Sequence, residues 1–201
     1  MNSAQFNICI ICEGYEEFDY LTKLKEKRVF QDQYLLKLIN AKGITKIFTR
    51  YIEKYQSSSH NLVLIFCDTD KEKQEAFWNL LDNINSFHDA NVANDIVIFS
   101  RPCTMQIFLS HFAKVELKKP SKTVNNGIIK ELTGIKEYDA TDDERNEFMS
   151  KIKRGNYEAM KENLKDISKN NSDIPSTNFL TLIENLENPN PSWIDNINRK
   201  L

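Results

Sequence analysis

Short apolar runs alternate with longer amphipathic segments over roughly the first 115 residues of the chain. The apolar runs cover residues 6–12, 34–39, 62–67 and 96–99. Runs that are apolar at nearly every position are typical of strands buried on both faces, as in a parallel sheet. The segments between them and after the last one have apolar residues at helical spacing, over residues 15–27, 44–55, 71–87 and 105–115. This alternation predicts an α/β fold, a parallel sheet of about four strands sandwiched by helices.

The pattern changes after the sequence Lys118-Lys119-Pro120. Strand-like runs end there, and amphipathic segments with helical spacing follow at residues 124–132, 142–152, 157–167 and 177–186. We therefore expect an α/β domain over residues 1–118 and a helical C-terminal extension or cap over residues 119–201.

Composition limits the function classes. The 201 residues include 27 basic and 29 acidic side chains, for a formal charge of -2, so no general positive field attracts nucleic acid. A polyanion site must then be a local patch. We see no apolar stretch near the ~18 residues of a membrane span and no basic leader before the first apolar run. Four cysteines without a second C-x-x-C pair suggest neither disulfides nor zinc. We expect a cytoplasmic protein.

Acidic side chains follow two of the predicted strands at the point where each strand ends. Glu13, followed by Gly14, ends the first run, and Asp68 and Asp70 end the run over residues 62–67. Carboxyl ends of parallel strands meet at one edge of a sheet, where ligands bind. Carboxylates gathered there repel one another unless a cation or protons intervene, and oxygen ligands suit Mg²⁺ or Mn²⁺. We predict a divalent metal site made of these three residues, with Glu72 as an additional candidate ligand.

Helix capping is the alternative interpretation of the second acidic group. Asp70 precedes the helix predicted over residues 71–87 and suits its N-cap, and Glu72 and Glu75 suit its first turns. The sequence DTDKE taken alone leaves both interpretations open. The separate Glu13-Gly14 pair favours the metal site, because glycine lets the chain turn tightly beside the carboxylate.

The order of these features resembles a known family. A strand, Glu13-Gly14 and a helix are followed about 55 residues later by a strand and Asp68-Thr69-Asp70, as in the Toprim domain of topoisomerases, bacterial primases and OLD-type nucleases. Within that superfamily the chain resembles the RloB-like proteins, which are associated with prokaryotic phage defence and abortive infection. Residues 10–21, IICEGYEEFDYL, are similar to their first motif, and residues 101–112, RPCTMQIFLSHF, to their proline-containing motif. The acidic residue expected near Thr104 or Met105 is absent.

The resemblance implies a function and roles for the site residues. Glu13 matches the Toprim glutamate, a metal ligand or general acid/base, and Asp68 and Asp70 match the metal-binding pair. The implied activity is a Mg²⁺-dependent nuclease that cleaves DNA or RNA, tRNA included, as an antiphage effector. An ATPase partner would be encoded separately, because this chain has no Walker-type motif.

Basic residues near these motifs are candidate nucleic-acid contacts. The set is Lys71, Arg101, His111, Lys114, Lys118 and Lys119. Arg101 follows a strand at the predicted edge and suits a bidentate phosphate contact, and the lysines suit a nucleic-acid backbone. The ordinary alternatives are a solvated linker for the lysines and a packed core histidine for His111, which has apolar neighbours.

Two other function classes remain open at this point. One is a non-catalytic binding module that senses nucleic acid or a partner, favoured by the missing acid near Met105. The other is a HAD-like phosphatase, in which Asp68 would be phosphorylated and Asp70 would act as acid/base. Those enzymes usually have D-x-D-x-[TV] after their first strand, whereas position 72 here is glutamate.

Overall fold

The computed structural model describes residues 5–69 and 74–201. Its centre is a five-stranded sheet with the order β2-β1-β3-β4-β5. The first four strands are parallel, and they are β1 (Phe6–Cys12), β2 (Tyr34–Asn40), β3 (Leu62–Asp68) and β4 (Val97–Arg101). The short β5 (Ser176–Thr177) runs antiparallel to β4. The predicted α/β fold with a mainly parallel sheet is confirmed, with one additional strand that the sequence did not predict.

Strand β1 lies between β2 and β3 and has partners on both sides. Its residues 8–12 are all buried, which explains why the run is apolar at every position and not at alternate ones. Cys12 lies opposite Phe66 of β3 in the register of the two strands. Glu13, which follows Cys12, and Asp68, the last residue of β3, therefore reach the same edge of the sheet.

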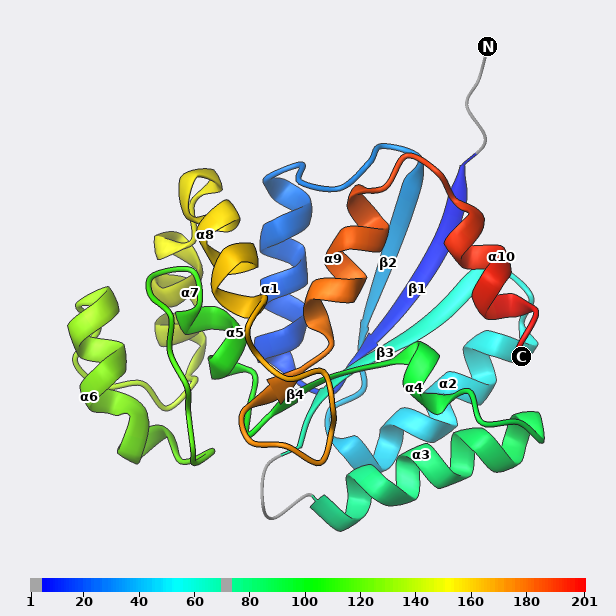
Figure 1. The fold of residues 1–201 in the computed structure, drawn as a ribbon, viewed down its shortest axis with the longest axis horizontal. Helices are drawn as coiled ribbons and strands as arrows, with labels where there is room; N and C mark the ends of the chain where they lie inside the picture. Colours follow the sequence, from blue (N-terminus) through cyan, green and yellow to red (C-terminus); the bar gives the residue numbers. More distant parts are fainter. Residues whose placement is uncertain (1–4, 70–73) are drawn as a thin grey trace.

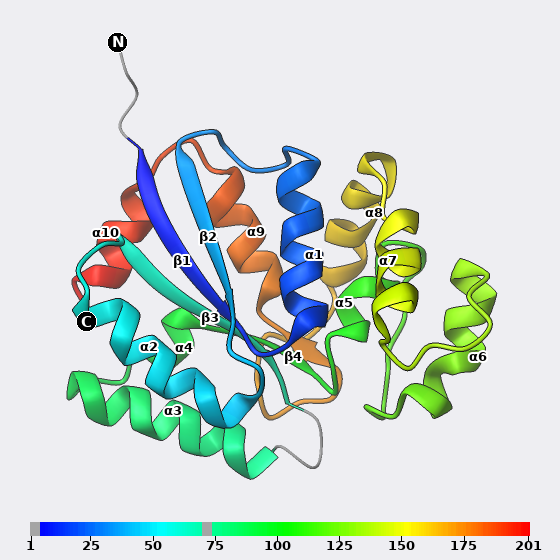
Figure 2. The same ribbon diagram turned by 180° about the vertical axis from the view of Figure 1, so that it is seen from behind.

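Helices cover both faces of the sheet (Figures 1 and 2). Helices α1 (Tyr15–Glu26) and α9 (Phe179–Glu187) lie on one face, and α2 (Ile47–Gln56) and α3 (Gln74–His88) lie on the other. The remaining helices are η1 (Ile44–Lys46), α4 (Ala93–Ile96), α5 (Met105–Leu109), α6 (Lys122–Thr133), α7 (Asp142–Lys151), α8 (Arg154–Leu164) and α10 (Ser192–Asn198). Within the described ranges, every helix is too short or too polar to cross a bilayer.

Most predicted helices agree with the structure to within a few residues, but α5 is much shorter than the predicted segment 105–115. The carboxamide of buried Gln106 explains the difference. It donates to the Val115 carbonyl at 2.8 Å and accepts from the Leu117 amide at 2.8 Å. These bonds hold the chain after α5 alongside the helix instead of continuing it. Helices α4 and α10 were not predicted.

The end of the chain returns to the sheet. Phe179, the first residue of α9, stacks on Phe66 of β3 with 5.2 Å between ring centroids and lies 5.5 Å from the ring of Tyr20 on α1. Residues 176–187 thus supply both a strand and a core helix to the α/β layer. The buried apolar side chains of both parts of the chain belong to one cluster. The predicted domain boundary at residue 118 stays a prediction.

Phe179→Ala tests whether α9 belongs to this core. The ring is fully buried, so its removal should lower the free energy of unfolding by about 3–5 kcal/mol. Urea denaturation of the purified chain measures the change. Val124→Ala is the control, because Val124 is 59% exposed and should change stability by less than about 0.5 kcal/mol. Equal stability of the two variants would place α9 outside the core.

Candidate functional site

Glu13 and Asp68 meet at the carboxyl edge of the sheet. The Glu13 amide donates to the Phe66 carbonyl at 2.9 Å, which extends the pairing of β1 and β3 by one residue. The Glu13 carboxylate then accepts the Asp68 amide, with 3.2 Å from Oε2 to N. Glu13 is only 5% exposed. The structure therefore brings these two predicted site residues together, whereas Asp70, Lys71 and Glu72 lie outside the described residues.

Two cavities open beside this pair. The first, of about 190 Å³, is lined by Glu13, Gly14, Tyr15, Glu16, Glu17, Asp68, Ala140 and Arg145. The second, of about 150 Å³, shares Glu16 and Asp68 with the first and extends to Thr104, Met105 and Lys122. We call Glu13, Glu16, Glu17 and Asp68 the carboxylate site. Its members come from the end of β1, the first turn of α1 and the end of β3.

Glu17 is a member that sequence reasoning missed. Its carboxylate accepts the Gly14 amide at 3.0 Å and the hydroxyl of Thr104, and the residue is 4% exposed. Burial, followed by the charges of Glu16 and Glu13, raises the pKa of Glu17 from 4.5 to about 7. Glu17 therefore lies beside Thr104, one of the two positions near which the resembling motif would have its own acid. In the sequence it looks like an ordinary first-turn glutamate, favoured by the helix dipole.

Cationic and hydroxyl groups from the later helices contact the acids of α1. Lys122 of α6 lies 3.0 Å from a Glu16 carboxylate oxygen, and the Tyr138 hydroxyl donates to the other at 3.0 Å. Arg145 of α7 pairs with Asp19 at 2.8 Å and lies over the Tyr15 ring, 4.9 Å from its centroid. Figure 2 shows α7 next to α1. These contacts offset part of the negative charge at the carboxylate site.

Among the described residues, the predicted basic contacts do not line either cavity, and Lys71 lies outside the described ranges. Arg101 donates to the Asn171 carbonyl at 2.8 Å, Lys114 pairs with Asp166 at 2.7 Å and Lys118 pairs with Glu116 at 3.1 Å. Lys114, Lys118 and Lys119 are all exposed. Their contacts with nucleic acid stay predictions.

The structure corrects the prediction for His111. The residue is 1% exposed, with Nε2 2.8 Å from the Tyr20 hydroxyl and Nδ1 3.2 Å from the Asn156 carbonyl. A carbonyl only accepts, so Nδ1 carries the proton and Nε2 accepts from the hydroxyl. Burial lowers the pKa of His111 to about 4, which keeps the ring neutral at pH 7. The ring is a packed core group and cannot touch nucleic acid, because apolar neighbours hide it from solvent.

The carboxylate site fits one common mode of magnesium binding. Mg²⁺ is usually held by one or two protein carboxylates together with waters and substrate phosphates. Glu13, which follows β1, and Asp68, the last residue of β3, both line the first cavity and carry carboxylate oxygens. Among residues 5–69 and 74–201, no group of three aspartate, glutamate, histidine or cysteine side chains is arranged to enclose an ion. The described residues therefore offer an open carboxylate pair and not a closed protein cage.

Comparisons with known proteins add no further constraint. No family model, curated protein or solved structure matches this chain. The interpretation of the site therefore depends on its geometry and on the motifs described above.

The pKa of Glu17 predicts how stability changes with pH. Between about pH 4.5 and pH 7 the folded chain retains a proton that the unfolded chain has released, so the free energy of unfolding falls as pH rises through this window. Glu17→Gln cannot ionise and should lose this slope. Relative to the wild type, the variant should gain roughly 1–3 kcal/mol between pH 5 and pH 8.

Urea denaturation over that pH range measures the difference. Glu137→Gln is the matched control, because Glu137 is exposed and should leave the slope unchanged. A Glu17→Gln profile parallel to that of the wild type would show that this carboxyl is ionised throughout.

Proposed function

We propose that this chain is a metal-dependent nuclease of the Toprim type, RloB-like, which cleaves DNA or RNA phosphodiesters. The observation that carries the proposal is the hydrogen bond from the Asp68 amide to the Glu13 carboxylate. It joins the two loops in which the Toprim resemblance expects its metal-binding acids. The position at the carboxyl ends of parallel strands is where open α/β sheets bind ligands.

The architecture supports the same proposal. Four parallel strands with helices on both faces are compatible with a Toprim-like domain over residues 1–118. In this proposal, residues 119–201 form a helical C-terminal extension whose α6 and α7 lie beside the site and contribute Lys122 and Arg145. Positive groups next to a carboxylate pair reduce its repulsion for a polyanionic substrate.

Glu13 and Asp68 would each have a distinct role in the proposed cleavage reaction. A bound Mg²⁺ or Mn²⁺ would neutralise charge on the phosphate and activate water. Asp68 and Glu13 would hold the ion or, for Glu13, move a proton. The Asp68 amide orients Glu13 through the 3.2 Å hydrogen bond, so this carboxylate is in place before substrate arrives.

The biological setting comes from the motif resemblance alone. We propose a cytoplasmic antiphage effector that acts in abortive infection, with tRNA among its candidate substrates and an ATPase encoded separately as its partner. The predicted contacts at Lys71, Arg101, Lys114, Lys118 and Lys119 would bind the nucleic-acid backbone.

One observation favours a non-catalytic alternative. The acid that the resembling motif would have near Thr104 or Met105 is absent, and the Thr104 hydroxyl donates to the buried Glu17 carboxylate. A domain that lacks a metal ligand can still bind nucleic acid or a partner protein without cleaving. The two functions differ in what the carboxylate substitutions below should change.

Glu13→Gln and Asp68→Asn test the nuclease directly. With supercoiled plasmid and total tRNA as substrates, and Mg²⁺ or Mn²⁺ present, each variant should cleave at least about 10²-fold more slowly than the wild type, because each loses a group that acts on the reacting phosphate. EDTA should abolish cleavage by the wild type. The matched controls are Glu137→Gln and Asp143→Asn, which change exposed carboxyls outside both cavities.

Two outcomes would contradict the proposal. If both variants cleave as fast as the wild type, neither carboxylate acts in the cleavage reaction. Absence of cleavage together with nucleic-acid binding that survives Asp68→Asn would support the non-catalytic module. Thermal unfolding of each variant confirms that the folded state is intact.

A further inference from the structure

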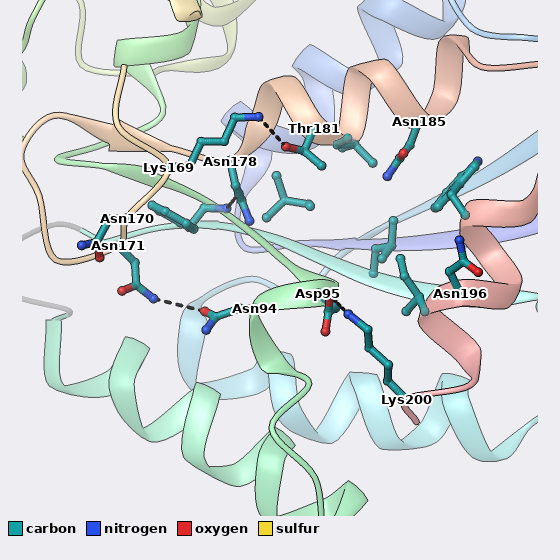
Figure 3. A pocket seen from close by; sticks show the side chains of 16 residues that line it. Asn94, Asp95, Lys169, Asn170, Asn171, Asn178, Thr181, Asn185, Asn196 and Lys200 are labelled. Atoms are coloured by element: carbon teal, nitrogen blue, oxygen red, sulfur yellow. Dashed lines mark hydrogen bonds and ion pairs between the residues drawn. The ribbon is translucent and has the colours of Figure 1, made fainter. Parts of the chain in front are cut away.

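A third cavity lies elsewhere in the fold and shares no lining residue with the two cavities of the carboxylate site. Its volume is about 510 Å³, within the range of small-molecule binding sites. Figure 3 shows it framed by α9 above, α10 at the right, α4 below and the loop that carries Asn170 and Asn171.

The floor of this cavity is apolar, and its walls are rich in carboxamides. Leu64 of β3, Ile98 of β4 and Leu182 of α9 form part of the floor, and all three are buried. The carboxamides belong to Asn94, Asn170, Asn171, Asn178, Asn185 and Asn196. An apolar surface with a few convergent polar groups is the usual composition of a ligand site.

Some of these carboxamides have structural roles. Asn178 donates to the Val97 carbonyl at 2.9 Å and accepts the Phe99 amide at 2.8 Å, so it pairs with the edge of β4 that β5 does not cover. Asn171 donates to the Asn94 side chain at 3.2 Å. These hydrogen bonds hold the walls of the cavity together. They use part of the donor and acceptor capacity of these carboxamides, which a ligand therefore cannot use.

Asn185 and Asn196 differ from them. Asn185 is half-buried and Asn196 is exposed, and within the described part of the chain neither side chain makes a hydrogen bond with another residue. Figure 3 shows both at the same end of the cavity, on α9 and α10. Each carboxamide offers a donor and an acceptor in one plane. The pair can therefore bind a planar ligand edge that carries the complementary acceptor and donor.

The charges at the cavity favour an anion. Lys200 pairs with Asp95 at 2.6 Å, which neutralises that carboxylate. Lys169 donates to the Thr181 hydroxyl at 3.2 Å and makes no ion pair with any residue in the described ranges. One positive charge thus remains at the end of the cavity opposite Asn185 in Figure 3.

We propose that this cavity binds a nucleotide. The base would lie on the apolar floor with its hydrogen-bonding edge against Asn185 and Asn196, and the phosphate would reach Lys169. Asparagine carboxamides match the adjacent donor and acceptor atoms of heterocyclic bases, adenine above all. A neutral sugar would bring no negative charge to Lys169, and an acyl chain would make no hydrogen bond with the two carboxamides. The inference does not depend on the carboxylate site.

Isothermal titration of the full chain in EDTA, with the four ribonucleoside 5′-monophosphates and their nucleosides, tests this proposal. We expect saturable binding of at least one monophosphate and about tenfold weaker binding of its nucleoside. Asn185→Ala and Asn196→Ala should each weaken binding by roughly three- to tenfold. Lys169→Gln should remove the preference for the monophosphate.

Matched controls separate these effects from general ones. Asn83→Ala changes an exposed carboxamide on α3 outside the cavity and should leave binding unchanged. The proposal is overturned if no monophosphate binds saturably, if the Asn185 and Asn196 variants bind as the wild type does, or if methyl glucoside binds equally well. Because EDTA is present throughout, these outcomes are separate from the test of metal-dependent cleavage.

Discussion

The pairing of β1 with β3 is the constraint on which the carboxylate site depends. Its register places Cys12 opposite Phe66, and the ladder continues through the bond from the Glu13 amide to the Phe66 carbonyl. Glu13 then has its carboxylate against the Asp68 amide. Two acids more than fifty residues apart are thus positioned by backbone hydrogen bonds, with buried apolar side chains on both faces of the sheet holding the strands in place.

Collecting carboxylates at one edge costs free energy, and the fold offsets this cost in two ways. Burial raises the pKa of Glu17 to about 7, so this carboxyl is partly protonated near neutral pH and the negative charge of the cluster is reduced. Lys122 and Tyr138 contact Glu16, and Arg145 pairs with Asp19 on the same helix. The later helices therefore stabilise the first turn of α1 as well as covering it, and the site is a product of both halves of the chain.

The carboxamide-lined cavity arises from a different feature, the part of the β4 edge that β5 does not pair with. Strand β5 pairs only with Ser100 and Arg101, and the Asn178 side chain pairs with the backbone of Val97 and Phe99. An edge that is closed by a side chain and not by a full strand leaves room beside it. Helices α9 and α10 and the loop after α8 surround that room without filling it.

By itself the sequence determined the parallel strands and most helices, because burial on both faces or on one helical stripe leaves a local pattern of apolar residues. It also placed Glu13 and Asp68 at strand ends. Only tertiary structure decided the rest. Ser176–Thr177 has no apolar pattern, so its pairing with β4 could not be predicted. Glu17 looks like an ordinary first-turn glutamate, and the sequence left open whether His111 contacts nucleic acid or packs in the core. Both are buried, and they hydrogen-bond with Thr104 and Tyr20, which are distant along the chain. Burial of a polar group depends on partners that local spacing does not reveal.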